Sequence, residues 1–189
     1  MSSYASLTDP KAYHILAYGT LLGSTMFQTF IAGPVAFKAL PRPSFSSLQS
    51  AIFPVFFSIQ SVLPVVLALT WPGKKVLETA GGLAVREGAG LKGLLQNDNF
   101  WTGLIPVAIM FGTAFINLTV FGPTTMKVMK ERKHQETKDG KRYYEAGPKS
   151  PEMQRLNKKF ATLHGISSLS DLVGLFAMIY YGFVIAEQI

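Results

Sequence analysis

Residues 160–186 read FATLHGISSLSDLVGLFAMIYYGFVIA, a stretch whose only formally charged side chain is Asp171. Three further stretches, residues 12–37, 43–73 and 99–126, contain no Asp, Glu, Lys or Arg. A helix needs about 20 apolar residues to cross the hydrocarbon core of a membrane, and each stretch exceeds that length. Lipid offers no partners to backbone groups, so only helices or closed barrels span it, and these stretches are too long for barrel strands. We therefore predict an all-α fold, a four-transmembrane-helix bundle made of two antiparallel hairpins.

The chain has 189 residues, and four such helices leave no room for a second globular domain. We predict one membrane domain over residues 1–189. The four helices are predicted at about residues 12–40, 44–71, 99–127 and 151–187. A basic cytosolic loop at residues 127–159 is predicted to join the last two. The absence of cysteine excludes disulfides and thiolate metal sites.

The positive charge is concentrated in one segment. Residues 127–159 hold eleven Lys or Arg against five Asp or Glu, which leaves +6 of the overall +7. By the positive-inside rule this segment faces the cytosol, and both termini and the loop at 74–98 lie on the lumenal or exterior side. We predict the lipid bilayer, anionic lipid headgroups and other membrane proteins as partners, and no nucleic acid. The expected location is the endomembrane system, with a mitochondrial membrane as the alternative.

Proline and glycine mark the turns between these helices. The sequence Pro41-Arg42-Pro43 predicts a tight turn between the first two helices. The glycine-rich segment 74–98 is predicted to be mobile, with short interfacial helices. Residues 134–147 are polar and are predicted to be disordered. Ser150 is the expected N-cap of the last helix, with Pro151 at its first position.

Two glycine–proline pairs lie inside predicted helices. Gly33-Pro34 and Gly122-Pro123 are expected to kink the first and third helices. Each pair follows an amide residue at the same spacing, Gln28 in one case and Asn117 in the other. This spacing indicates a weak internal repeat of the two hairpins, for which coincidence among apolar segments is the alternative.

Small residues on the first helix indicate a packing surface. Gly19 and Gly23 have the small-xxx-small spacing that lets two membrane helices approach closely.

Asp171 is expected about 12 Å inside the membrane, since it lies about eight residues past the start of its apolar stretch. An intramembrane carboxylate is costly and indicates a functional site by default. Amides at comparable depth on the other helices suggest that it is buried inside the bundle. The alternatives are hydrogen-bonding between helices and a substrate or proton path. The predicted intramembrane polar cluster consists of Gln28, Gln60, Asn117, Ser168 and Asp171.

Two histidines are candidate ligands. His164 is expected near the cytosolic interface and His14 near the opposite end of the bundle. About 25–30 Å of membrane would separate them, so they cannot share a metal ion. A haem or metal bound through either one alone is a possible alternative, but the prediction is that the protein has no cofactor and no metal.

Several stretches together resemble the transmembrane protein 205-like family of small eukaryotic four-helix membrane proteins. The stretches are Lys11 to His14, Phe30 to Arg42, Phe45 to Pro54, Gly122 to Thr125 with Met129, and Lys159 to Leu169. The resemblance implies a multi-pass membrane protein with a part in export or vesicle traffic. A more distant similarity to copper-resistance and haem-pathway membrane proteins keeps a ligand role for His14 or His164 open. Asp171 stands where that family has asparagine, and Gly122 where it has an acidic residue, so no catalytic carboxylate and no ion pair follow from the resemblance.

These observations predict a non-enzymatic, transport-related or membrane-trafficking protein. One alternative is a haem- or metal-binding membrane enzyme. The other is a structural subunit of a larger membrane complex.

Overall fold

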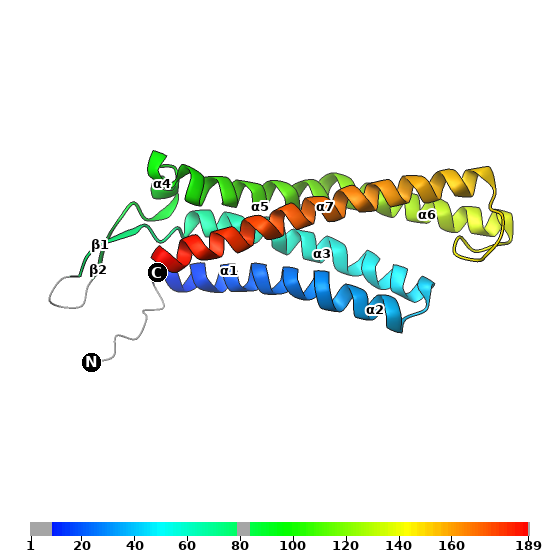
Figure 1. Cartoon of the computed structure of the whole chain (residues 1–189), viewed down its shortest axis with the longest axis horizontal. Coiled ribbons are helices and arrows are strands. Elements are labelled where there is room, and N and C mark those ends of the chain that lie inside the picture. Colours follow the sequence, from blue (N-terminus) through cyan, green and yellow to red (C-terminus); the bar gives the residue numbers. More distant parts are fainter. Residues whose placement is uncertain (1–8, 79–83, 189) are drawn as a thin grey trace.

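Four long helices lie side by side along the molecule in the computed structural model, which describes residues 9–78 and 84–188 (Figure 1). Each is long and apolar enough to cross a membrane: Pro10–Ala39, Arg42–Leu69, Asn97–Asp139 and Pro151–Gln188. The all-α, four-helix prediction is therefore confirmed.

The first and third long helices are built from segments joined end to end. The first comprises α1 (Pro10–Met26), the π-helical turn η1 (Phe27–Ala32) and α2 (Gly33–Ala39). The second is α3 (Arg42–Leu69) and the fourth is α7 (Pro151–Gln188). The third comprises the 3₁₀ turn η2 (Asn97–Asn99), the π-turn η3 (Phe100–Leu104), α5 (Ile105–Ile116), the π-turn η4 (Asn117–Phe121) and α6 (Gly122–Asp139).

The segment after α3 forms a short β hairpin that the sequence did not predict. Strand β1 (Lys74–Glu78) pairs antiparallel with β2 (Ala84–Glu87), and the short helix α4 (Gly90–Leu94) follows. The short helix agrees with the predicted interfacial helix of this segment.

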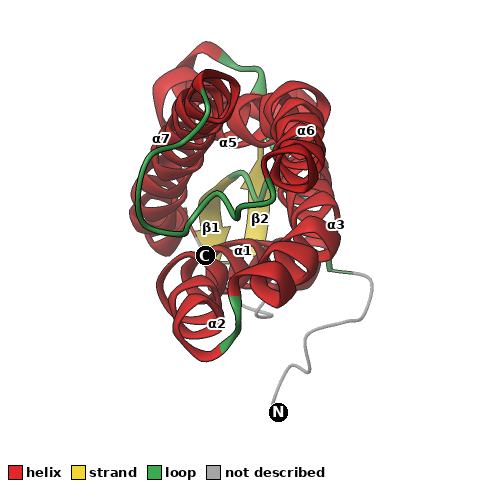
Figure 2. Cartoon of the chain, turned by 90° about the vertical axis from the view of Figure 1, so that its right-hand side faces the viewer, coloured by secondary structure: helices red, strands yellow, loops and turns green. Residues whose placement is uncertain are grey.

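Neighbouring helices pack in the order α1, α3, α5 and α7, and α7 crosses the bundle diagonally. The second half of α7 lies against α1, whereas its first half lies against α6 (Figure 1). In the end view of Figure 2 the helices surround the long axis, with α2 and α7 on different parts of the ring. Helices α1 and α7 are therefore in contact toward the end that holds the β hairpin and diverge toward the end that holds the α6–α7 connection (Figure 1).

Each π-turn stands directly before an X–Pro pair. The amide of Gly33 donates to the carbonyl of Gln28, and that of Gly122 donates to Asn117, five residues back in both cases. Proline lacks an amide hydrogen and its ring collides with the carbonyl four residues earlier, so a wider turn relieves the clash. The predicted kink positions are thus π-turns, and the internal repeat extends to the backbone.

A backbone carbonyl lies close to the glycine at both of these turns. A Cβ atom on Gly33 would lie 3.0 Å from the Gln28 oxygen, and one on Gly122 would lie 2.8 Å from the Asn117 oxygen.

The small-residue prediction for the first helix is wrong, because Gly19 and Gly23 face open space. The close approaches instead involve glycines of α7: a Cβ on Gly174 would meet Thr113 of α5, and one on Gly182 would meet Tyr18 of α1.

The basic segment differs from the predicted loop. Helix α6 continues to Asp139 and ends at Gly140, whose φ of 58° is left-handed. Residues 134–139 are therefore helical, and the prediction of disorder over 134–147 is wrong there. The oxygen of Ser150 accepts from the amide of Met153 at 3.2 Å, which confirms the predicted N-cap. Only residues 140–150 connect α6 and α7, so the basic segment is mostly a helical hairpin.

Two ends of the bundle are defined by these connections. The described ends of the chain and the β hairpin lie at one end, and the α6–α7 connection lies at the other (Figure 1). Helix α6 and the first half of α7 project past the turn between α2 and α3. At 1.5 Å per residue, the 43 residues of the third helix span about 65 Å, roughly twice the hydrocarbon thickness.

Substituting Gly122 tests the π-turn. We expect Gly122→Ala to lower the free energy of unfolding by about 1–3 kcal/mol, because its methyl group collides with a backbone oxygen that cannot move independently. Gly112→Ala is the matched control in the same long helix, where a Cβ meets nothing within 4 Å. Thermal melting in detergent measures both variants. Equal melting temperatures for the two would contradict the role assigned to Gly122.

Single cysteines test the topology, since the chain has none of its own. Thr137→Cys and Asn97→Cys place exposed thiols at opposite ends of the bundle. A membrane-impermeant maleimide should label them from opposite sides of sealed vesicles, and the positive-inside rule predicts that position 137 is cytosolic. Labelling of both from the same side would refute the four-span arrangement.

Candidate functional site

Asp171 lies where α1, η1, α3 and α7 meet. The Nε2 atom of Gln60 donates to Asp171 Oδ1 at 3.0 Å and also to Thr25 Oγ1 at 3.0 Å. Gln60 is 1 % exposed, whereas Asp171 is only partly buried. The predicted pairing of Gln60 with Asp171 is present in the structure.

The orientation of the Gln60 amide follows from its neighbour. The Thr25 hydroxyl donates its one hydrogen to the Leu21 carbonyl at 2.7 Å, so toward Gln60 it can only accept. Nε2 must therefore face Thr25 and Asp171. The Oε1 atom of Gln60 is buried and has no hydrogen-bond donor.

The other predicted cluster members lie in separate contacts. Gln28 donates to Gln49 Oε1 at 3.2 Å, a partner on α3 that the sequence analysis did not consider. Asn117, which is 0 % exposed, donates to the Ser167 carbonyl at 3.2 Å, and its Oδ1 has no donor. Four of the five predicted residues thus take part in three separate hydrogen-bonded contacts, and Ser168 joins none of them.

A polar stripe runs along the outer face of α7. His164, Ser168 and Asp171 follow one another at helical spacing, and the first two are exposed. The same side of α7 is covered by α1 further along, where Met178 and Tyr181 are buried. The stripe is uncovered at His164 and Ser168, nearer the α6–α7 connection, where α1 and α7 have diverged (Figure 1).

His14 lies in a second polar site at the opposite end. The Thr70 hydroxyl donates to the Val66 carbonyl at 2.7 Å, so it accepts from His14 Nδ1 at 3.0 Å. The neutral imidazole then accepts at Nε2 from the Tyr181 hydroxyl, also at 3.0 Å. Both ring nitrogens are occupied, which leaves no nitrogen for the predicted haem or metal alternative without breaking one bond.

Sequence reasoning missed the partners of His14. Thr70 and Tyr181 lie at the far ends of two other apolar stretches, and neither carries a signal of its own. The rings of Trp71 and Tyr18 lie near Tyr181, with centroids 6.2 and 6.0 Å away. This end of the bundle is a tightly packed core in which Leu21, Leu67 and others are fully buried.

His164 has a different environment. Its ring stacks on Phe160 with centroids 5.7 Å apart, and it is exposed. Within the described residues no three His, Cys, Asp or Glu side chains gather as a metal site would require. The two predicted ligand histidines therefore lie at different ends of the bundle, as expected, and in different surroundings.

The basic hairpin holds one buried cation. Arg132 is 8 % exposed, and its guanidinium carbon lies 3.8 Å from the Tyr143 ring centroid and 4.5 Å from that of Phe160. Such contacts over aromatic faces are worth about 2 kcal/mol when they are desolvated. Arg132 thus fixes the connection to both helices of the hairpin.

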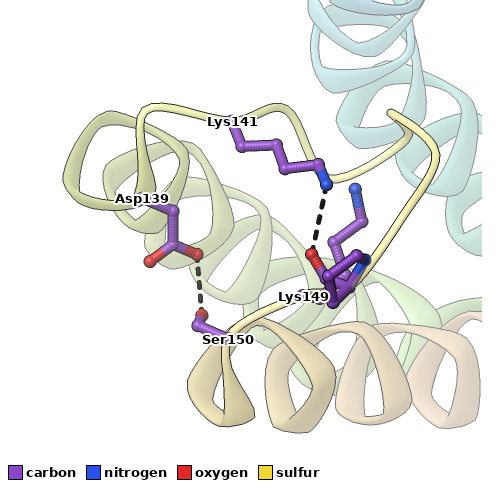
Figure 3. A pocket seen from close by; sticks show the side chains of 5 residues that line it. Asp139, Lys141, Lys149 and Ser150 are labelled. Carbon is purple, nitrogen blue, oxygen red and sulfur yellow. Dashed lines mark hydrogen bonds between the residues drawn. The ribbon is translucent and has the colours of Figure 1, made fainter.

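A surface hollow lies beside this connection (Figure 3), lined by Asp139, Lys141, Pro148, Lys149 and Ser150. The Lys141 amine donates to the Pro148 carbonyl and Ser150 donates to Asp139. The Lys149 amine donates to the carbonyls of Arg142 and Glu145. The two lysine amines therefore bind backbone carbonyls and help to hold the connection together.

The fold and these contacts define a multi-pass, membrane-type helical bundle with a polar centre at Asp171. Residues 16–134 match the family described as Domain of unknown function (DUF4149), and the chain belongs to that family. It is 26 % identical over 177 residues to Xanthocillin biosynthesis cluster protein D of Aspergillus fumigatus, covering 94 % of this chain and 89 % of that protein. No solved structure matches the chain. The comparisons give no support to the transmembrane protein 205-like family in particular, so that resemblance stays a prediction.

Removing one hydroxyl tests the His14 site. Tyr181→Phe keeps the ring but leaves His14 Nε2 buried without a donor, which we expect to cost about 1–3 kcal/mol. Tyr180→Phe is the matched control, because Tyr180 is exposed on the lipid-facing side. Detergent melting of both variants should show a loss for Tyr181→Phe only. A loss of equal size in both would contradict the hydrogen-bonded assignment.

Proposed function

We propose that this chain is a non-enzymatic, transport-related membrane protein in which Asp171 takes part in moving a small molecule or ion. The observation that carries the proposal is a partly exposed carboxylate inside a membrane span. A carboxylate in hydrocarbon is retained at a high cost, and such residues mark substrate, ion and proton paths. If it served only to join helices, burial on all sides would be expected.

The surroundings of Asp171 support this role. Gln60 holds the carboxylate by a hydrogen bond, so the carboxylate is positioned before any ligand arrives. Ser168 and His164 continue the polar surface along α7 toward the basic hairpin. The opposite end of the bundle is closed by the apolar core around Leu21, Leu67 and Tyr181. An approach from the α6–α7 side therefore meets polar groups, whereas the other side presents packed apolar ones.

The basic hairpin suggests how the protein sits in its membrane. We propose that its exposed lysines face the cytosol and contact anionic headgroups, which would place Asp171 within reach of the cytosolic leaflet. An endomembrane location and a part in membrane traffic are compatible with this arrangement. The name of the fungal relative assigns that protein to a biosynthesis cluster and states nothing about transport, so the proposal depends on Asp171.

Two substitutions at one position separate transport from simple helix joining. Asp171→Asn keeps the shape and hydrogen-bonding capacity, so we expect stability within about 0.5 kcal/mol of the parent but loss of complementation in a deletion strain. Asp171→Leu also leaves the Gln60 amide without its partner, and should cost about 1–2 kcal/mol.

Ser170→Ala is the control for this experiment. Ser170 neighbours Asp171 but points to the other side, where its hydroxyl donates to the Thr113 carbonyl of α5 at 3.3 Å. This variant should complement fully. Full complementation by Asp171→Asn as well would reject a role in transport and favour a structural subunit, which co-purification of a stoichiometric membrane partner would then identify.

A further inference from the structure

The interior beside Asp171 contains more hydrogen-bond acceptors than donors. Gln60 Oε1 and Asn117 Oδ1 are both buried without a partner. Neither amide can be turned to remove this shortage. Gln60 must present its nitrogen to Thr25, and Asn117 must present its nitrogen to the Ser167 carbonyl, which accepts only. Two buried amide oxygens without a donor among the described residues therefore accompany the Asp171 carboxylate in this part of the bundle.

These three groups belong to one region of the bundle. Gln60 touches the carboxylate directly, so its free oxygen lies within the width of one amide group from that contact. Asn117 is anchored on Ser167, which precedes Asp171 by four residues, or about 6 Å of helix rise. No Lys or Arg occurs in residues 43–73, 99–126 or 160–186, the stretches that surround them. The protein itself supplies no positive charge to balance Asp171.

The donor set selects the kind of ligand. Carboxylate and amide oxygens are hard ligands, which suit alkali-metal ions and ammonium groups and not the softer transition metals. A single carboxylate matches a single positive charge, whereas a divalent ion would leave an uncompensated charge in a low-dielectric site. The two free amide oxygens would then complete the coordination of that ion.

We propose that Asp171, Gln60 and Asn117 bind one small monovalent cation, either an alkali-metal ion or a short alkylammonium ion. This inference rests on the proposed function and names the class of ligand at the same site. The cation enters along the His164 and Ser168 side of α7, where the carboxylate is partly exposed. It stops at Asp171, because the apolar core from Leu21 to Tyr181 closes the bundle beyond that level.

Thermal melting of the purified full-length protein tests this site. NaCl, KCl and methylammonium chloride are each compared with N-methyl-D-glucamine chloride at equal ionic strength, since the last cation is too large to enter. A bound cation should raise the melting temperature by about 2–4 °C at saturating concentration. A shift with Na⁺ or K⁺ alone identifies an alkali-metal site, and a shift with methylammonium alone identifies an ammonium site.

Two single substitutions show whether the cation-dependent rise in melting temperature comes from Asp171. Asp171→Asn should lose the cation-dependent shift, and Ser170→Ala should keep it. An identical melting temperature in all four salts, or an undiminished shift in Asp171→Asn, would overturn the proposal.

A second measurement uses only the parent protein, in case Asp171→Asn does not fold. A hydrophobic carbodiimide reacts with carboxyl groups inside membranes, and mass spectrometry reports how much of Asp171 is modified. The cation that raises the melting temperature should slow this modification at least about threefold relative to N-methyl-D-glucamine, which corresponds to a site about two-thirds occupied. Unchanged modification would overturn the cation site. If Asp171→Asn still failed to complement, the proposed transport role would stand with a ligand of another class.

Discussion

Lipid offers no hydrogen-bond partners, and this constraint explains most of the structure. The backbone meets it by forming four long helices, and it does so even at proline, where a π-turn replaces the ordinary turn. The glycine before each of two prolines allows the displaced carbonyl to approach closely. Side chains meet the same constraint by pairing across helices, as Gln28 does with Gln49 and His14 with Thr70 and Tyr181.

The bundle meets this requirement unequally at its two ends. Around His14 both imidazole nitrogens have partners and large apolar side chains fill the space between α1, α3, α5 and α7, although the buried indole Nε1 of Trp71 has no acceptor among the described residues. Around Asp171 the carboxylate is partly exposed, and two buried amide oxygens have no donor among the residues that the structure describes. Unsatisfied buried polar groups are rare in native proteins and call for an explanation such as a ligand or water. The bundle therefore combines a rigid closed end with an open polar one.

The hairpin outside the membrane extends the open end. Helix α6 continues past the bilayer because residues 127–139 are rich in Lys, Glu, Arg and Gln, all strong helix formers. Val128 of α6 and Met153 and Leu156 of α7 are buried, and Arg132 of α6 lies over the rings of Tyr143 in the connection and Phe160 of α7. High charge suggested a loop, but helix propensity together with this small core outweighed it.

The sequence by itself determined the number of spans, the N-cap at Ser150 and the placement of Asp171 at the level of Gln60. These follow from hydropathy, helix rise and local capping chemistry, which depend on neighbours along the chain. Only the tertiary structure decided which amides pair, that Gly19 and Gly23 face outward, and that His14 meets Thr70 and Tyr181. Such contacts depend on how each helix is rotated and tilted, and in a bundle with few charges many rotations bury similar apolar surface. The rotation is settled by close approaches such as Gly174 against Thr113, whose fit appears only when the helices are assembled.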